Sequence, residues 1–224
     1  MPHPSTESTP RIRIILPVHR DRDAVLQTLS RLLTQGWRRE ELLVVTADEP
    51  DTRDAVREQG VKVINLGADL RGRAHQMNAG ARETNVDLLV FLHADTRLPP
   101  DARDQLARAY LGGAVGGGFR RRFDSPSLFL KLTCRLADLR GKALGWYFGD
   151  QTIWVRREVF ETLGGFPDQA LFEDLAFSRR LKTKGRSALL PGPTLSSARR
   201  FAAEGPLLRT WKDLRLTLRY LSRE

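Results

Sequence analysis

The chain has 224 residues, of which 41% are hydrophobic, and a formal net charge of +10 at pH 7. This length and composition predict one α/β domain with a substantial core. The single cysteine, Cys134, excludes an internal disulfide and favours a reducing compartment, and no run of 18 apolar residues suggests a membrane-spanning helix. The excess positive charge favours an anionic partner.

The first half of the sequence alternates short apolar runs with segments whose apolar residues recur at helical spacing. This alternation predicts parallel strands joined by helices. Residues 1–10 lack the apolar stretch of a secretory signal and are expected to form a short disordered lead. The expected strands are 12–17, 42–45, 61–65 and 88–92, and the expected helices are 21–33, with Asp21 as its N-cap, 51–59 and 72–84.

The second half has a less regular pattern. The glycine-rich stretch 111–119 is interpreted as a flexible link, and the arginine run 120–122 as the solvated end of a strand. The expected helices are 101–110, 128–139, 156–163 and 173–184, and the expected strands are 119–123, 152–155 and 188–190. We expect residues 11–204 to form a single domain.

The last twenty residues, 205–224, predict an amphipathic helix. Their apolar residues recur at intervals of four and three, and basic residues outnumber acidic ones. Two interpretations stay open: a closing helix packed on the sheet, or a helix that lies on an anionic membrane and brings the active site to a lipid-linked acceptor. The apolar face comprises Leu207, Trp211, Leu214, Leu218 and Leu221, and the charged residues are Arg209, Lys212, Arg215, Arg219 and Arg223 against Asp213 and Glu224.

Two pairs of polar residues stand where strands or loops end. His93 and Asp95 follow the apolar run 88–92, and residues two apart in an extended chain point the same way. Together with a substrate diphosphate they would suffice to bind Mg²⁺ or Mn²⁺. The alternative is a capped turn in which Asp95 accepts backbone N–H bonds. Glu173 and Asp174 begin a predicted helix, where acids also complement the helix dipole.

The order of five motifs resembles family 2 glycosyltransferases of the GT-A fold. They are a strand ending in proline at 17, then GRAHQMNAGA (72–81), FLHADTRLP (91–99), FGDQTIWVRREVFETLGGFPD (148–168) and EDLAFSRRL (173–181). The segments FLHADT, GDQ and SARR resemble more narrowly a small bacterial subfamily found beside radical-SAM and arsenosugar-type genes. The resemblance spans roughly residues 11–201 and implies a mostly parallel sheet flanked by helices, followed by the C-terminal helix.

The resemblance also implies roles for individual residues. Asp174, with Glu173 beside it, matches the catalytic base of the ED motif, and Asp95 matches the acid that reaches the metal and the diphosphate. Asp95 is thus the second acid of the family's DxD motif, and His93 stands where the first acid of the DxD motif usually is. The implied donor-side residues are Pro17, Val18, His19, Asp48, Asp51, Arg73, Asn78, His93, Ala94 and Asp95, and those on the acceptor or diphosphate side are Asp150, Gln151, Arg199 and Arg200.

One stretch departs from the family pattern. The family usually has an acid directly after the second strand, where it contacts the nucleotide. Thr46 stands at that position here, Asp51 matches the later acid, and Asp48 is a candidate substitute. The identity of the nucleotide therefore does not follow from the sequence.

The function implied is transfer of a sugar from a nucleotide-diphosphate sugar to an acceptor hydroxyl, with inversion, a divalent cation and a cytoplasmic location. Three alternative functions are compatible with parts of this pattern. A degenerate GT-A protein that binds anionic ligands or a membrane surface remains open. A nucleotidyltransferase is disfavoured because residues 16–24 contain no glycine-rich loop, and a nucleic-acid binder because the basic residues are spread along the chain.

Overall fold

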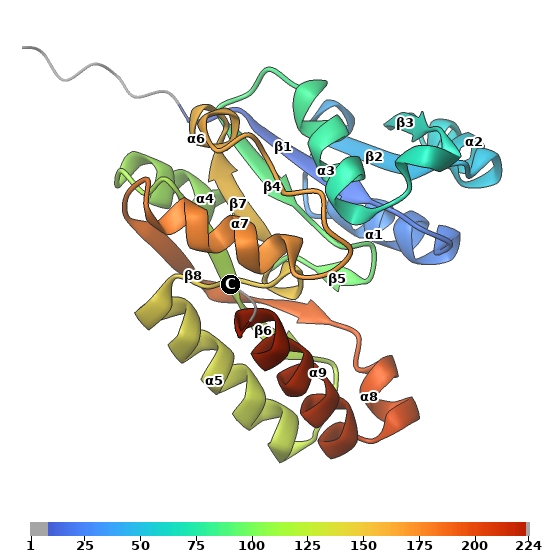
Figure 1. Cartoon of the computed structure of the whole chain (residues 1–224). Helices are drawn as coiled ribbons and strands as arrows, with labels where there is room; N and C mark the ends of the chain where they lie inside the picture. Colours follow the sequence, from blue (N-terminus) through green and yellow to red (C-terminus); the bar gives the residue numbers. More distant parts are fainter. Residues whose placement is uncertain (1–8, 223–224) are drawn as a thin grey trace, which may run out of the picture.

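The computed structural model describes residues 9–222 and shows an eight-stranded sheet with helices on both faces (Figure 1). The strand order is β3-β2-β1-β4-β7-β6-β8-β5. Most of the expected lead, residues 1–8, lies outside the described part, as do Arg223 and Glu224. Those expectations, and the division of the chain at residue 204, stay predictions.

The first half of the chain forms parallel βα units, as the alternation predicted. Strand β1 lies between β2 and β4, and β2 pairs with β3, all in parallel. Asp21 precedes the first helix, as expected, but its side chain makes no capping hydrogen bond. The strands are β1 (Ile12–Pro17), β2 (Leu42–Ala47), β3 (Lys62–Leu66) and β4 (Leu88–Phe91); the helices are α1 (Arg22–Thr34), α2 (Pro50–Glu58) and α3 (Arg73–Arg82), with short 3₁₀ turns η1 (Arg39–Glu41) and η2 (Ala68–Leu70).

The second half extends the sheet with mixed pairing. Strand β7 is antiparallel to both β4 and β6, β6 is parallel to β8, and β8 is antiparallel to the short β5. The strands are β5 (Thr96–Arg97), β6 (Gly116–Phe123), β7 (Ile153–Arg156) and β8 (Ser187–Ser196); the helices are α4 (Ala102–Leu111), α5 (Leu128–Leu144), α6 (Arg157–Thr162) and α7 (Glu173–Lys182), with the 3₁₀ turn η3 (Gly149–Gln151).

The core has two layers because alternate residues of each strand face opposite sides of the sheet. On β1, Ile12, Ile14 and Leu16 pack with α1, α2 and α4, whereas Ile15 packs on the other side with α3, α6 and α7. The second layer leads to the loop before α7 and so supports the start of that helix.

The glycine-rich stretch is not a flexible link, contrary to the prediction. Strand β6 already begins at Gly116 and is sandwiched between β7 and β8. A Cβ atom on Gly117 would lie 1.9 Å from the carbonyl oxygen of Ala188, and one on Gly116 would lie 2.7 Å from that of Trp154. Glycine is needed here because neighbouring backbone comes too close for a side chain.

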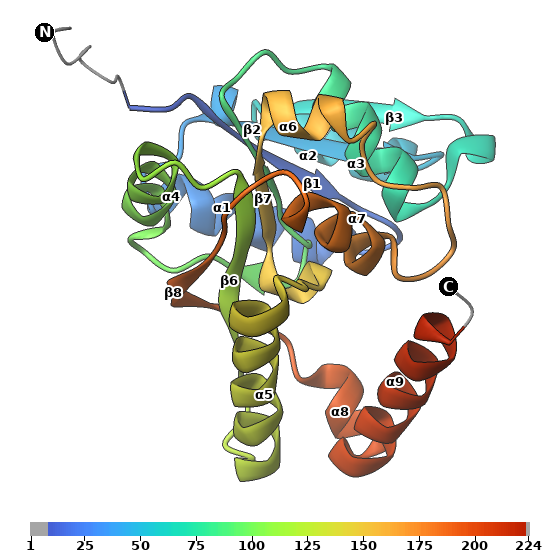
Figure 2. The same cartoon turned by 60° about the vertical axis from the view of Figure 1, so that its left-hand side comes forward.

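The chain ends in two helices, α8 (Arg199–Glu204) and α9 (Pro206–Leu221), which lie with α5 at one end of the molecule (Figure 2). The amphipathic helix is present, with Pro206 in its first turn. The interpretation that it closes the sheet is wrong, because no residue of α9 is buried. Within residues 9–222, no helix is long and apolar enough to cross a bilayer.

Candidate active site

Asp174 lies in the first turn of α7 and is held by two backbone groups. Its Oδ2 accepts a hydrogen bond of 2.6 Å from the N–H of Gly149, and its Oδ1 accepts one of 2.7 Å from the N–H of Leu175. The residue is only 8% exposed. The carboxylate therefore has a fixed orientation in a largely dry position.

The surroundings of Asp174 favour its protonated form. Burial, followed by the neighbouring charge of Glu173, raises the pKa of Asp174 to about 6, although the two backbone hydrogen bonds and Arg73 act in the opposite direction. Glu173 is also buried, and its Oε1 lies 3.3 Å from Nη1 of Arg73 in α3. The result is a carboxylate that can gain or release a proton near neutral pH.

His93 lies against the same glycine as Asp174. A Cβ atom on Gly149 would come within 2.4 Å of the His93 ring and within 3.3 Å of Oδ2 of Asp174. A cavity of about 10 Å³, room for about one water molecule, lies between these groups. It is lined by Arg73, Met77, Phe91, His93, Gly149, Ile153, Phe166 and Asp174. The structure thus brings together four predicted residues: Asp174, His93, and the pair Arg73 and Glu173.

Phe172, directly before the acids, links the site to the C-terminal helix. Its ring centroid lies 6.2 Å from that of Phe148 and 5.1 Å from that of Tyr220 in α9. Its φ of +65° is in the left-handed region, which costs a residue with a side chain about 1 kcal/mol or more. No local sequence pattern predicts this contact, because it joins residues far apart in the chain.

The carboxyl ends of β1 and β2 form the other side of the site. The side chain of Gln76 donates to the carbonyl oxygens of Val18, at 2.6 Å, and Val45, at 3.2 Å, and so fixes both strand ends. Pro17 and Val18 are buried there, whereas the side chain of His19 is exposed.

Sequence reasoning missed Glu49, which lies beside His19. Its side chain is only 11% exposed, and its Oε1 lies 3.3 Å from Nδ1 of His19. The carboxylate also accepts hydrogen bonds from the N–H of Arg20, at 2.7 Å, and the hydroxyl of Thr52, at 3.1 Å. A largely covered carboxylate therefore stands at this edge although Thr46 is not an acid.

The other residues after β2 are arranged differently. Thr46 is fully buried and donates to Oδ1 of Asn65, at 2.7 Å. Asp48 has a φ of +56° and its Oδ2 lies 2.6 Å from Nη2 of Arg71, while Asp51 is exposed in the first turn of α2. Asp48 and Asp51 are thus separate from the carboxylate of Glu49, and their donor-binding roles stay predictions.

Asp95 lies in the turn after β4, next to Ala94, whose carbonyl oxygen accepts a hydrogen bond from Thr28. The turn is closed by the N–H of Thr96, which donates to the carbonyl of His93 at 3.1 Å. Asp95 is partly buried, and its carboxylate makes no hydrogen bond or ion pair with any described residue. It does not cap the turn, so it remains available to a ligand.

The described residues do not form a closed metal site. They fit a cation that would be bound together with a phosphate-containing ligand. Among residues 9–222, no group of three or more His, Cys, Asp or Glu side chains could hold a metal ion. A single carboxylate, completed by phosphate oxygens and water, suits Mg²⁺, which usually keeps several waters and is bound by one or two carboxylates. Asp95 meets this requirement.

Asn78, predicted on the donor side, uses its amide for a structural link. It donates to the carbonyl of Phe166 at 2.8 Å and accepts from the N–H of the same residue at 2.9 Å. These bonds tie α3 to the loop that leads to α7. A direct role in donor binding stays a prediction.

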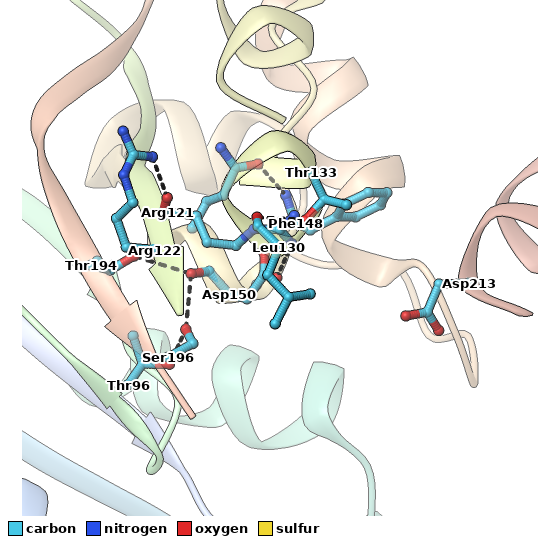
Figure 3. A network of polar contacts seen from close by, with 12 residues as sticks. Thr96, Arg121, Arg122, Leu130, Thr133, Phe148, Asp150, Thr194, Ser196 and Asp213 are labelled. Carbon is cyan, nitrogen blue, oxygen red and sulfur yellow. Dashed lines mark hydrogen bonds and ion pairs between the residues drawn. The ribbon is translucent and has the colours of Figure 1, made fainter. Parts of the chain in front are cut away.

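The segment with Asp150 and Gln151 belongs to a second polar network (Figure 3). Arg121 donates to Oδ2 of Asp150, and the backbone carbonyl of Asp150 accepts from Thr194 at 3.1 Å. Gln151 is fully buried, with its Oε1 2.7 Å from Nη2 of Arg140. Burial lowers the pKa of Arg140 to about 10.

The arginine run in this network is only partly solvated, which corrects the prediction. The side chain of Arg121 is only 13% exposed, and Arg120 and Arg122 both pair with the buried carboxylate of Asp138, at 2.8 and 3.2 Å. Helix α5 supplies that carboxylate, so the strand end is covered. Cys134, on the same helix, is buried as expected.

The segment SARRF, residues 197–201, contacts both the start of α1 and the end of β6. Nη2 of Arg199 is 3.5 Å from Oδ2 of Asp21, at the start of α1, and the ring of Phe201 packs 4.8 Å from that of Phe123. The side chain of Arg200 lies outside what the structure describes. The roles of both arginines stay predictions.

Solved structures of known proteins have a similar fold. The structure is similar to mannosyltransferase PcManGT from Pyrobaculum calidifontis, in complex with GDP-Man and Mn²⁺, with a TM-score of 0.64 and 23% identity over 85% of this chain and 57% of that one. It is also similar to TarS 1–349 of S. aureus in complex with UDP-GlcNAc, with a TM-score of 0.62, 14% identity, and coverage of 84% and 58%. These likenesses establish the GT-A fold.

Curated relatives agree with the fold. The chain is 25% identical over 207 residues to the probable glycosyltransferase YdaM of Bacillus subtilis, covering 79% of this chain and 47% of YdaM. It is 34% identical over 98 residues to 4,4'-diaponeurosporenoate glycosyltransferase of Staphylococcus haemolyticus, covering 41% and 26%. The chain spans about half the length, or less, of these relatives. Because the model of glycosyl transferase family 2 matches residues 13–166, which is more than half of the chain, the protein belongs to that family.

Proposed function

We propose that this protein transfers a glycosyl group from a nucleotide-diphosphate sugar to an acceptor hydroxyl, with inversion at the anomeric carbon. The observation that carries the proposal is the buried carboxylate of Asp174, oriented by Gly149 at the end of the sheet where ligands bind in open α/β folds. Membership of the family and the relatives' names support it. The proposal names neither a particular nucleotide nor a particular sugar.

Asp174 is the proposed general base. The acceptor oxygen attacks the anomeric carbon as its proton passes to a carboxylate oxygen of Asp174, and the bond from that carbon to the diphosphate oxygen breaks on the opposite face. A pKa raised to about 6 suits this task, because a base works best when its pKa is near the working pH. Glu173, paired with Arg73, keeps negative charge beside it.

A divalent cation, Mg²⁺ or Mn²⁺, is proposed to be held by Asp95 together with the donor. When bound, it would offset the charge that develops on the leaving diphosphate. Arg73, whose side chain is 44% exposed, is close enough to the cavity to add positive charge on that side. His93 packs against Gly149 and shapes the space between the donor and the base.

Glu49 and His19 are proposed to contact the nucleoside. The carboxylate of Glu49 is already aligned by Arg20 and Thr52, so it can replace the acid that Thr46 does not supply. Pro17 and Val18 provide apolar backbone beside it. This assignment lets a nucleotide bind despite the departure from the family pattern.

The acceptor is proposed to be lipid-linked, with α9 lying on an anionic membrane at the cytoplasmic face. The support is the amphipathic character of α9, whose apolar residues are exposed rather than buried. A degenerate GT-A protein that only binds anionic ligands is the alternative. The position of Asp174 does not favour this alternative. A buried carboxylate beside a second acid, Glu173, would not stabilise a bound anion.

The proposal is tested with a panel of UDP-, GDP- and dTDP-sugars, each with and without Mn²⁺. The matching donor should raise the melting temperature, because it binds the native state alone. Release of nucleoside diphosphate should then depend on Mn²⁺, and NMR of the glycoside should show the inverted anomer. A donor that binds without any turnover in the presence of membrane lipid extract would favour the degenerate alternative.

A further inference from the structure

Helix α5 exposes a row of leucines that its packing does not use. Leu128, Leu132, Leu136 and Leu139 are between 52% and 78% exposed, and their spacing of four, four and three puts them on one helical face. The opposite face carries the buried residues Leu130, Cys134, Ala137, Asp138 and Gly141. The leucine face is therefore directed away from the sheet, toward solvent.

The charges of α5 complement an anionic surface. Lys131, Arg135 and Lys142 are exposed and make no ion pair with any described residue. The one acid of this helix, Asp138, is buried and paired with Arg120 and Arg122. The exposed part of α5 is thus a leucine row flanked by positive charge alone.

Helix α9 has the same construction. Leu207, Trp211, Leu214 and Leu218 are between 47% and 69% exposed and share one face. A surface hollow of about 360 Å³ along this face is lined by Trp211, Leu214, Arg215, Leu218, Arg219 and Ser222. It combines an apolar floor with a cationic edge.

The acids near α9 are already neutralised. Glu204 pairs with Arg209 and Lys212, and Asp213 pairs with Arg209. Arg215 and Arg219 make no ion pair with the residues that the structure describes. The positive charge beside the apolar face of α9 is therefore available to an external anion.

We propose that α5 and α9 together form one docking surface for an anionic lipid bilayer. Both helices lie at the same end of the molecule, away from α2, α3 and α6, so one flat surface can contact both (Figures 1 and 2). Apolar burial and attraction between basic side chains and acidic headgroups act together at such a surface. This proposal rests on the proposed function, because it identifies the surface through which the protein would reach a lipid-linked acceptor.

Each of the two helices is linked to one of the segments that hold Asp174, α5 through the chain and α9 through a ring contact. Helix α5 ends at Leu144, and five residues later Gly149 donates to the carboxylate. Tyr220 of α9 packs on Phe172, two residues before Asp174. A bilayer that binds both helices therefore presents its acceptor headgroups beside the proposed base.

The experiment is flotation of the full-length chain with vesicles of phosphatidylcholine alone or with about 30% phosphatidylglycerol. The chain should float only with the anionic vesicles and be released as salt is raised, because screening weakens headgroup attraction. The variant Leu132→Gln/Leu136→Gln should lower partitioning about tenfold, as should Leu214→Gln/Leu218→Gln. The matched control, Leu111→Gln at the exposed end of α4, should float like the wild type.

The variant Lys131→Gln/Arg135→Gln removes two positive charges of α5 and should also lower partitioning into anionic vesicles. It keeps the test decisive if the leucine variant of α5 is unstable. The proposal is overturned if the wild type ignores anionic vesicles, or if both α5 variants float as it does. It is also overturned if light scattering shows a dimer that Leu132→Gln/Leu136→Gln dissociates, because the leucines would then be an interface between two copies. Flotation needs no donor, and Asp174→Asn should float normally, so a failure of the proposed chemistry would not be mistaken for a failure of docking.

Discussion

The backbone N–H of Gly149 donates a hydrogen bond of 2.6 Å to Oδ2 of Asp174. Gly149 begins η3 and Asp174 lies in the first turn of α7, so the bond joins two segments that are 25 residues apart in the chain. The His93 ring fills the space where a side chain at position 149 would be. A glycine in the GDQ motif is therefore required for the carboxylate and the imidazole to reach the same place.

The stability of the protein should depend on pH through Asp174. Its pKa is raised from the unfolded value of 3.8 to about 6, so the folded state binds more protons between these values and stability falls as pH rises through this window. The full effect is about 3 kcal/mol. Thermal melts of wild type and Asp174→Asn at pH 4.5 and 7.5 should show the variant gaining relative stability at the higher pH. A difference that does not change with pH would contradict the raised pKa.

Asp95→Ala should abolish the gain in donor affinity that Mn²⁺ provides, because the variant loses its only charged oxygen in the turn after β4. His93→Ala should weaken donor binding less, since the ring packs against Gly149. Calorimetry with the matching donor, with and without Mn²⁺, measures both effects. Asp104→Ala, an exposed acid of α4, is the control. Metal-dependent binding that survives in Asp95→Ala would move the cation elsewhere.

Phe172→Gly should lower kcat about tenfold while the KM for the donor stays near its wild-type value. Glycine adopts a φ of +65° without strain, which offsets the lost ring contacts, so the melting temperature should change little. What is lost is the ring of Phe172, which contacts both Phe148 and Tyr220 and so positions the start of α7. Tyr220→Phe, which keeps the ring, should retain activity. Equal kcat in Phe172→Gly and the wild type would show that the ring positions nothing.

Asp150→Ala should be destabilising by about 3–5 kcal/mol, because it leaves the buried guanidinium of Arg121 without its carboxylate. The double variant Asp150→Ala/Arg121→Met should recover most of that loss, since it removes both charges. Urea unfolding of the three proteins measures the difference. If the single variant is as stable as the wild type, Asp150 is held for binding rather than for the fold, as the resemblance implied.

Strands β1, β2 and β4 of the first half could be predicted because each is a mostly apolar, mostly buried run, whereas β3 is only partly buried. Strand β1 has the predicted bounds. Strand β8 was predicted too short because Pro191 and Pro193 are read as breaks, whereas the structure includes them at a register shift between Phe119 and Arg120. Periodicity also could not separate a buried helix from an exposed one in α9, since both require the same apolar stripe.

The candidate site was predictable where a motif marks it, as at Asp174 and His93. Glu49 was missed because an acid before a helix reads as an ordinary N-terminal residue, and its burial arises from contacts with Arg20 and Thr52. Arg121 was predicted to be solvated, because nothing in a run of three arginines shows that α5 and η3 cover its side chain. Such features depend on tertiary contacts that no local pattern encodes.

The central claim is tested most directly by the single-turnover rate of Asp174→Asn with the donor found in the sugar panel. The amide is nearly isosteric but accepts no proton, so we expect transfer to fall by about 10²- to 10⁴-fold while donor affinity stays within a few fold. In the wild type, the same rate should rise with pH around 6, as the carboxylate ionises. Transfer by Asp174→Asn at a rate near that of the wild type would contradict the account.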